Sequence, residues 1–158
     1  MRRPTVPSAA PPPLQDFLTW RLHRVNKLTD RASGEAYAQA FELPVGQARC
    51  LAAIGTDEPL SVVALAARAN LDKGQASRAA QALVERGLVA KQASGTDARV
   101  VSLSLTPAGA RLWRRVMVLI ARRNSEIFGC LSQAEQKQLG RMLDRVIAHT
   151  ETPARSTA

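Results

Sequence analysis

Aromatic residues, cysteines and histidines are all scarce in this chain of 158 residues. Phe, Trp and Tyr make up 4% of the sequence, and there are two cysteines and two histidines. An all-β core draws on aromatic and β-branched residues, so few aromatics together with frequent alanine favour closely packed helices. The two cysteines, Cys50 and Cys130, are too few for a disulfide framework.

The sequence also lacks the residue sets on which catalysis depends. It contains no glycine-rich phosphate loop, no nucleophile elbow and no credible Ser-His-Asp or Cys-His set. The two histidines are His23 and His149, and no cluster offers ligands at zinc spacing. We therefore expect neither an enzyme, nor a metal site, nor a bound cofactor.

Long apolar runs are absent as well. No stretch approaches the roughly 18 apolar residues that suggest a membrane span. The start, Met1-Arg2-Arg3, continues into prolines without the apolar segment of a signal peptide. We expect a soluble, cytoplasmic protein with no membrane partner, in which residues 1–13 form a disordered proline-rich arm and residues 151–158 a flexible tail.

Positive charge, in contrast, is plentiful. Lys and Arg number 22 against 13 Asp and Glu, which gives a net charge of +9 and a pI near 11.0. A small protein this basic commonly has a polyanionic partner such as nucleic acid. A well-solvated surface would explain the same excess, so the charge alone does not decide between them.

Hydrophobic periodicity predicts six helices and one β-hairpin within a single domain, residues 14–150. The first helix spans about residues 14–32. One of its faces is apolar and carries Leu14, Phe17, Leu18, Leu22, Val25 and Leu28. The second helix begins at Pro44 and stops at Gly55, and the third, which Ser61 caps, runs from Val62 to Ala69.

The next segment predicts a helix-turn-helix. Asn70 suits the left-handed turn after the third helix, Asp72 and Gln75 form a capping-box pair, and Gly87 ends the fourth helix. In a helix-turn-helix the second helix enters the DNA major groove. Its outward residues all form hydrogen bonds and are candidate base or phosphate contacts: Lys73, Gln75, Ser77, Arg78 and Gln81. A helical hairpin with a polar outer face would show the same pattern.

The residues after Gly87 favour the DNA-binding interpretation. Val101, Leu103 and Leu105 alternate with serines behind a glycine-containing turn, which predicts a β-hairpin, or wing, directly after the recognition helix. Arg99 lies near its tip and suits the minor groove. The other candidate DNA contacts there are Lys91, Thr96 and Asp97. Arg99 could equally form a salt bridge with Asp97, and that pair would orient it.

Long helices follow the hairpin. Thr106-Pro107 opens a fifth helix that reaches about Phe128, and Ser132 with Glu135 forms a capping box at the start of the sixth. The helices at about 14–32 and 107–149 have no place inside a minimal DNA-binding head, about 44–106. A symmetric dimer would bury their apolar faces. The predicted fold is mainly α with a small β-hairpin wing: a winged helix-turn-helix head plus N- and C-terminal dimerisation helices.

The order of these parts resembles the MarR family of bacterial regulators. Asp97-Ala98-Arg99 followed by Leu105-Thr106-Pro107-Ala108-Gly109 looks like the wing signature of that family. The segment 77–89 is similar to its recognition helix and exit, and 21–25 and 47–49 look like its first and second helices. Two features depart from the pattern, namely the Pro44-Val45-Gly46 start of the second helix and the proline-rich arm.

The resemblance implies a homodimer that binds double-stranded DNA at an inverted-repeat operator. It also implies repression released by a small aromatic acid or phenol. If the roles of the matching residues in that family apply to this sequence, Gln75, Ser77 and Arg78 would read or position bases. Arg99 would enter the minor groove. An architectural DNA-binding protein without ligand control remains an alternative.

Arg21 and Arg123 are candidate ligand-binding residues because each lies on an apolar helix face, where an unpaired charge is costly. With Trp20 and His23, Arg21 could anchor an aromatic or heteroaromatic carboxylate through bidentate hydrogen bonds. Each arginine could instead pair with a carboxylate across the dimer interface or extend to solvent. Redox sensing through Cys50 or Cys130 is a further alternative.

Overall fold

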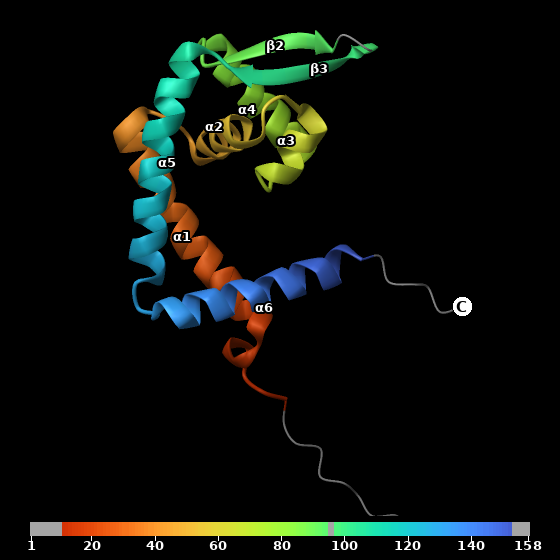
Figure 1. Ribbon diagram of the computed structural model, residues 1–158. Helices are drawn as coiled ribbons and strands as arrows, with labels where there is room; N and C mark the ends of the chain where they lie inside the picture. The colour runs from red at the N-terminus through yellow and green to blue at the C-terminus, as the bar shows by residue number, and fades with distance from the viewer. Residues whose placement is uncertain (1–10, 95–96, 153–158) are drawn as a thin grey trace, which may run out of the picture.

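The computed structural model describes residues 11–94 and 97–152 of the chain (Figure 1). The elements along the chain are η1 (Leu14–Asp16), α1 (Leu18–Phe41), α2 (Val45–Asp57), β1 (Leu60–Ser61), α3 (Val62–Arg68), α4 (Lys73–Glu85), β2 (Val89–Ser94), β3 (Asp97–Leu105), α5 (Pro107–Phe128) and α6 (Gln133–Glu151). The predicted fold, mainly helical with a small hairpin, is confirmed.

The hydrophobic core lies in the head, which comprises α2, α3, α4 and the sheet. Three antiparallel strands are ordered β1-β3-β2, and Leu60 pairs with Leu103. The side chains of Leu51, Leu65 and Leu83 are fully buried between these elements. In Figure 1 the head lies to one side of α5, and the β2–β3 hairpin extends along its upper edge.

Local hydrogen bonds define the helix ends in the head, as the sequence predicts. The Ser61 hydroxyl accepts from the Ala64 amide, and Asp72 and Gln75 make both bonds of a capping box. Asn70 and Gly87 adopt the left-handed backbone conformation, with φ of 52° and 68°. The tight turn between α3 and α4 and the sharp exit from α4 follow from these residues.

A close backbone contact fixes the start of α5 against the exit of α4. The Thr106 hydroxyl accepts from the Gly109 amide and donates to the Gly87 carbonyl, at 3.0 and 2.7 Å. A Cβ atom on Gly109 would lie 1.9 Å from the carbonyl oxygen of Leu88. Only glycine fits at this position, so the hairpin and α5 leave the head in a defined direction.

Two predicted helix boundaries are wrong. The first helix begins at Leu18 after a 3₁₀ turn and continues past Ala32 to Phe41, because its last turns pack on the head and bury Tyr37. The second helix continues through Gly55 to Asp57. A Cβ on Gly55 would lie 2.5 Å from the Trp113 indole, so this glycine permits close packing against α5 rather than ending the helix.

Two segments extend away from the head, and we call them the arm segments: residues 18–28 of α1 and the whole of α6. Every residue of both is at least partly exposed. Figure 1 shows α6 leaving the far end of α5 and running below the head. The arm segments expose large apolar side chains, namely Leu18, Trp20, Leu22, Val25, Leu28, Met142, Val146 and Ile147. Among the described residues, no helix is sufficiently long and apolar to cross a membrane.

Candidate nucleic-acid interface

Helix α4 divides cleanly into a buried face and an exposed face. Ala76, Ala79, Ala80 and Leu83 pack into the core. The five residues predicted to face DNA are all exposed on the other side: Lys73, Gln75, Ser77, Arg78 and Gln81. The helix therefore presents a continuous row of hydrogen-bonding side chains at the surface of the head.

Two of these residues already have hydrogen-bond partners. The Gln75 side-chain oxygen accepts from the Asp72 amide at 3.3 Å, a bond that does not use the Gln75 NH₂ group. The Gln81 oxygen accepts from the Lys91 ammonium at 2.6 Å, and its NH₂ group donates to Glu85 at 2.9 Å. Gln81 and Lys91 thus tie helix α4 to strand β2.

Positive charge dominates the first turns of α4. Glu85, in the last turn, is the helix's one acidic residue. Lys73 and Arg78 form no ion pair with any residue that the structure describes. Unpaired cations on an exposed helix face are available for phosphates or guanine edges.

The wing is only partly described. Lys91 is exposed on β2. Strands β2 and β3 pair antiparallel, beginning where Val89 lies opposite Leu105, and the register of the pairing shifts after Ala93. Thr96 lies outside the described residues, as do the side chains of Asp97 and Arg99. The predicted roles of these three residues therefore stay predictions.

The candidate ligand residues of α1 are exposed. The Arg21 guanidinium donates to the Asp16 carbonyl oxygen at 2.8 Å and lies 3.7 Å from its carboxylate. His23 lines a polar pocket of about 320 Å³ whose other lining residues are Thr19, Leu22, Asn26 and Asn70. Since Asn70 is the turn residue between α3 and α4, this pocket joins α1 to the helix-turn-helix.

Arg123 lies elsewhere, on α5. It pairs with Glu126, and its Nε atom is buried with no hydrogen-bond partner among the described residues. Its positive charge acts on Tyr37 of α1. The structure therefore does not bring Arg123 together with Trp20, Arg21 and His23.

A larger crevice, of about 500 Å³, lies between α1, α2, α3 and α5. Its polar residues are Tyr37, Arg49, Thr56, Asp57 and Arg68. Burial raises the pKa of Tyr37, and the charges of Arg49 and Arg123 oppose that rise. Both arginines of the crevice have carboxylate partners, since Arg49 pairs with Asp30 and Arg68 with Asp57.

The sequence prediction missed this crevice as a candidate site. Tyr37 lies beyond the predicted end of the first helix, so it had no predicted position. Arg68 ends α3 and carries no recognisable motif. Only Arg49, through its resemblance to the second helix of a known family, had a signal in the sequence.

Comparisons with known proteins agree with this architecture. Residues 41–100 match the model of the MarR family. A Thauera aromatica protein named for transcriptional regulation of the hcr operon is 31% identical over 105 residues, which are 66% of this chain and 63% of that protein. The match thus spans less than two thirds of that relative.

Two solved structures have a similar fold over most of the chain. The PcaV transcriptional regulator of Streptomyces coelicolor, in complex with its natural ligand, is 26% identical with a TM-score of 0.74, covering 90% of this chain and 100% of that one. BpsR of Bordetella bronchiseptica, studied for regulation of its DNA binding by 6-hydroxynicotinic acid, is 20% identical with a TM-score of 0.79, covering 87% and 97%. Residues 41–100, which include most of the head, therefore match the MarR family, and the helices of the chain are placed as in these solved regulators.

Proposed function

We propose that this protein is a transcriptional regulator of the MarR family and binds double-stranded DNA in a sequence-specific manner through α4 and the β2–β3 wing. The exposed face of α4 carries this proposal. Its cations lack ion-pair partners among the described residues, and its buried face holds the helix rigidly on the core. A helix held this way can present Gln75, Ser77 and Arg78 to base edges.

The regulator acts as a homodimer. The apolar side chains of the arm segments are 38–73% exposed in a single chain, which is a large unburied surface for a folded protein. A second copy related by a two-fold axis would cover them and would place two recognition helices in successive major grooves, about 34 Å apart. The operator is therefore an inverted repeat.

A small aromatic acid or phenol controls DNA binding, and the regulator represses until that ligand binds. Two features support this proposal: the crevice of about 500 Å³ between α1 and the head, and the His23 pocket beside the helix-turn-helix turn. The structural relatives studied with 6-hydroxynicotinic acid or with a natural ligand lend it further support. Trp20, Arg21 and His23 are the proposed ligand contacts, and Arg21 would exchange Asp16 for the ligand carboxylate. Arg123, which the structure places apart from them beside Glu126, is not a contact of the same ligand.

A gel-shift titration tests this function. The DNA upstream of the protein's own gene is compared with unrelated DNA, each with and without benzoate, 4-hydroxybenzoate and nicotinate. We expect the protein to bind one upstream site roughly 10³-fold more tightly than unrelated DNA. One of the acids should abolish this binding. Equal binding to both DNAs would instead indicate an architectural protein, and no binding to either would contradict the proposal.

A matched pair of variants tests the ligand contact. Arg21→Ala should abolish the response to the acid while DNA binding survives. Arg24→Ala removes another exposed arginine of the same helix and serves as the control. A full response in both variants would exclude Arg21 as the anchor.

A further inference from the structure

The wing is built on a sheet whose first strand, β1, is only two residues long. Leu60 of β1 lies opposite Leu103 of β3. Two residues before Leu60, the same antiparallel register would place Glu58 opposite Leu105, the last residue of β3. Regular pairing does not reach that far, because Glu58 is the residue that closes helix α2 and Pro59 has no N–H group to donate.

A side chain takes the place of the missing strand residue. The backbone amide of Leu105 donates to a carboxylate oxygen of Glu58, with 2.6 Å between the nitrogen and the oxygen. A hydrogen bond to a carboxylate is shorter and stronger than one to a neutral carbonyl group. Glu58 forms no ion pair with any residue whose side chain the structure describes. Its carboxylate therefore supplies the hydrogen bond that a longer β1 would supply.

The opposite edge of β3 is held by separate bonds. Val89 of β2 lies opposite Leu105, and the Thr106 amide donates to the Leu88 carbonyl oxygen at 3.1 Å. The Thr106 hydroxyl donates to the Gly87 carbonyl oxygen. These bonds join the base of the wing to the exit of α4. A strand held along one edge can pivot about that edge, whereas a strand held on both edges cannot, so the Glu58 bond removes this freedom.

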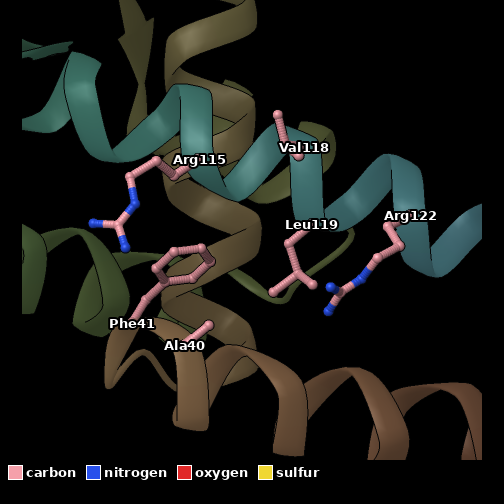
Figure 2. Close-up of a pocket in the computed structure, with 6 residues that line it drawn as sticks. All are labelled: Ala40, Phe41, Arg115, Val118, Leu119 and Arg122. Carbon is pink, nitrogen blue, oxygen red and sulfur yellow. The ribbon is translucent and has the colours of Figure 1, made fainter.

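Helix α5, which follows the wing, has its own anchor on α1. Arg115 lies over the Phe41 ring, with 5.2 Å from its guanidinium carbon to the ring centre. Figure 2 shows these two side chains next to each other at the side of a pocket between the helices. The position of α5 therefore does not depend on Glu58. The Glu58 bond instead joins the end of α2 to the base of the wing, across 47 residues of sequence.

We propose that Glu58 is a positioning residue for the wing: its carboxylate fixes the end of β3 and thereby the direction in which the β2–β3 hairpin meets DNA. Glu58 acts through Leu105 and does not itself contact DNA. Wing contacts in the minor groove depend on Glu58, whereas the contacts of α4 do not, because the buried face of α4 holds that helix on the core. The effect on DNA rests on the proposed function, but the hold on the hairpin does not.

The charge of Glu58 makes this proposal easy to distinguish from a simple electrostatic effect. Glu58 is exposed, and a negative charge on a surface that binds phosphates weakens the binding. If only this charge mattered, removal of the carboxylate would strengthen DNA binding. Removal of a bond that directs the wing would weaken DNA binding instead. The two explanations therefore predict changes of opposite sign.

Amide hydrogen exchange, followed by NMR on the full chain without DNA, tests the hold on the hairpin. Glu58→Ala should speed exchange of the Leu105 amide about tenfold or more, since the amide loses its acceptor. Glu58→Gln keeps a side-chain oxygen that can accept and should restore most of the protection. Asp57→Ala removes the neighbouring carboxylate, which pairs with Arg68 and not with β3, and should change the exchange less than twofold. Equal exchange of the Leu105 amide in the wild type and Glu58→Ala would overturn the proposal.

Gel shifts on the operator measure the sign of the effect. Glu58→Ala should weaken operator binding about fivefold to tenfold, and Glu58→Gln should bind within about twofold of the wild type. Asp57→Ala removes the same charge from the same loop and should bind as tightly as the wild type or more tightly. Tighter binding by Glu58→Ala would show that only the charge matters and would contradict a positioning role.

Two footprints at saturating protein separate the wing from α4. Hydroxyl radicals report the sugars that the wing covers in the minor groove, and dimethyl sulfate reports guanine N7 in the major groove. Glu58→Ala should lose the hydroxyl-radical protection beside the wing and keep the dimethyl sulfate protection under α4. Loss of both protections together would indicate a general loss of structure and overturn the proposal. Absence of any DNA binding by the wild type would refute the proposed function, whereas the exchange result would still decide whether Glu58 holds the hairpin.

Discussion

The head and the arm segments use the same kind of amphipathic helix in opposite ways. In the head, Leu51, Ile54, Leu65 and Leu83 are completely buried by other parts of the same chain. In α6, Val146 and Ile147 are each about half exposed. The head, with the adjoining parts of α1 and α5, thus buries its core within one chain, whereas the arm segments are suited to burial against a second chain.

The largest expected effect is a difference in stability between a variant in the head and a variant in an arm segment. Leu51→Ala leaves a cavity in the head and should lower the free energy of unfolding by about 2–5 kcal/mol. Leu22→Ala, in an arm segment where the side chain is 48% exposed, should have a smaller effect that grows with protein concentration. Urea denaturation at two protein concentrations measures both. A concentration-independent loss of equal size in the two variants would contradict the division into head and arm.

A charge in an arm segment should break the dimer without unfolding the head. Ile147→Glu puts a carboxylate on the apolar face of α6, so we expect a monomer by light scattering and a loss of operator affinity of about 100-fold, roughly 2.7 kcal/mol. Gln138→Glu adds the same charge on the opposite face of α6 and should stay dimeric. If both variants remain dimers, α6 is not at the interface.

Substitutions on α4 should change which DNA is bound. Arg78→Ala should cost about 1–3 kcal/mol on the preferred operator and relax discrimination at one base pair. Lys73→Ala, which removes the other unpaired cation of the first turns, should weaken all sequences similarly, as expected for a phosphate contact. Binding to a set of single-base operator variants measures both. The assignment of Arg78 as a base reader fails if its loss weakens every operator variant equally.

The smallest effect concerns the two thiols, one in the head and one where α5 meets the arm segment α6. Burial raises the pKa of Cys50, in the head, to about 11, so at pH 8 only about one molecule in a thousand carries the thiolate. Cys130, at the junction of α5 and α6, is exposed. Ellman's reagent should therefore modify one thiol per native chain, and the second only after unfolding. Rapid modification of both native thiols would reopen redox sensing through Cys50.

Much of the proposed DNA-binding surface could be predicted from the sequence because its signals are local. The exposed row on α4 follows from helical periodicity over nine residues, 73–81, and from the caps on either side. The crevice and the contact between Phe41 and Arg115 could not be predicted in this way. Tyr37 and Phe41 reach these places only because α1 continues beyond its predicted end, and that continuation depends on packing against the head.

The glycines illustrate the same limit. Gly87 was correctly interpreted as a helix end because its left-handed conformation is a local property. Gly55 gives the same sequence signal, a glycine after an apolar helical pattern. In the structure, however, it makes room for the indole of Trp113, which lies more than fifty residues later on α5. A sequence pattern does not distinguish a glycine that ends a helix from one that allows two helices to approach.

The starts of four helices follow from nearby residues alone. Ser61, Asp72, Thr106 and Ser132 each accept a hydrogen bond from a backbone amide three residues later, so the signal lies within one turn of sequence. The contacts that join one region to another, in contrast, arise only when the helices pack together. Arg86 reaches the end of α1 across 44 residues, and Arg115 reaches Phe41 from α5. Such pairs depend on how the helices pack in space, which the hydrogen bonds within one helix do not specify.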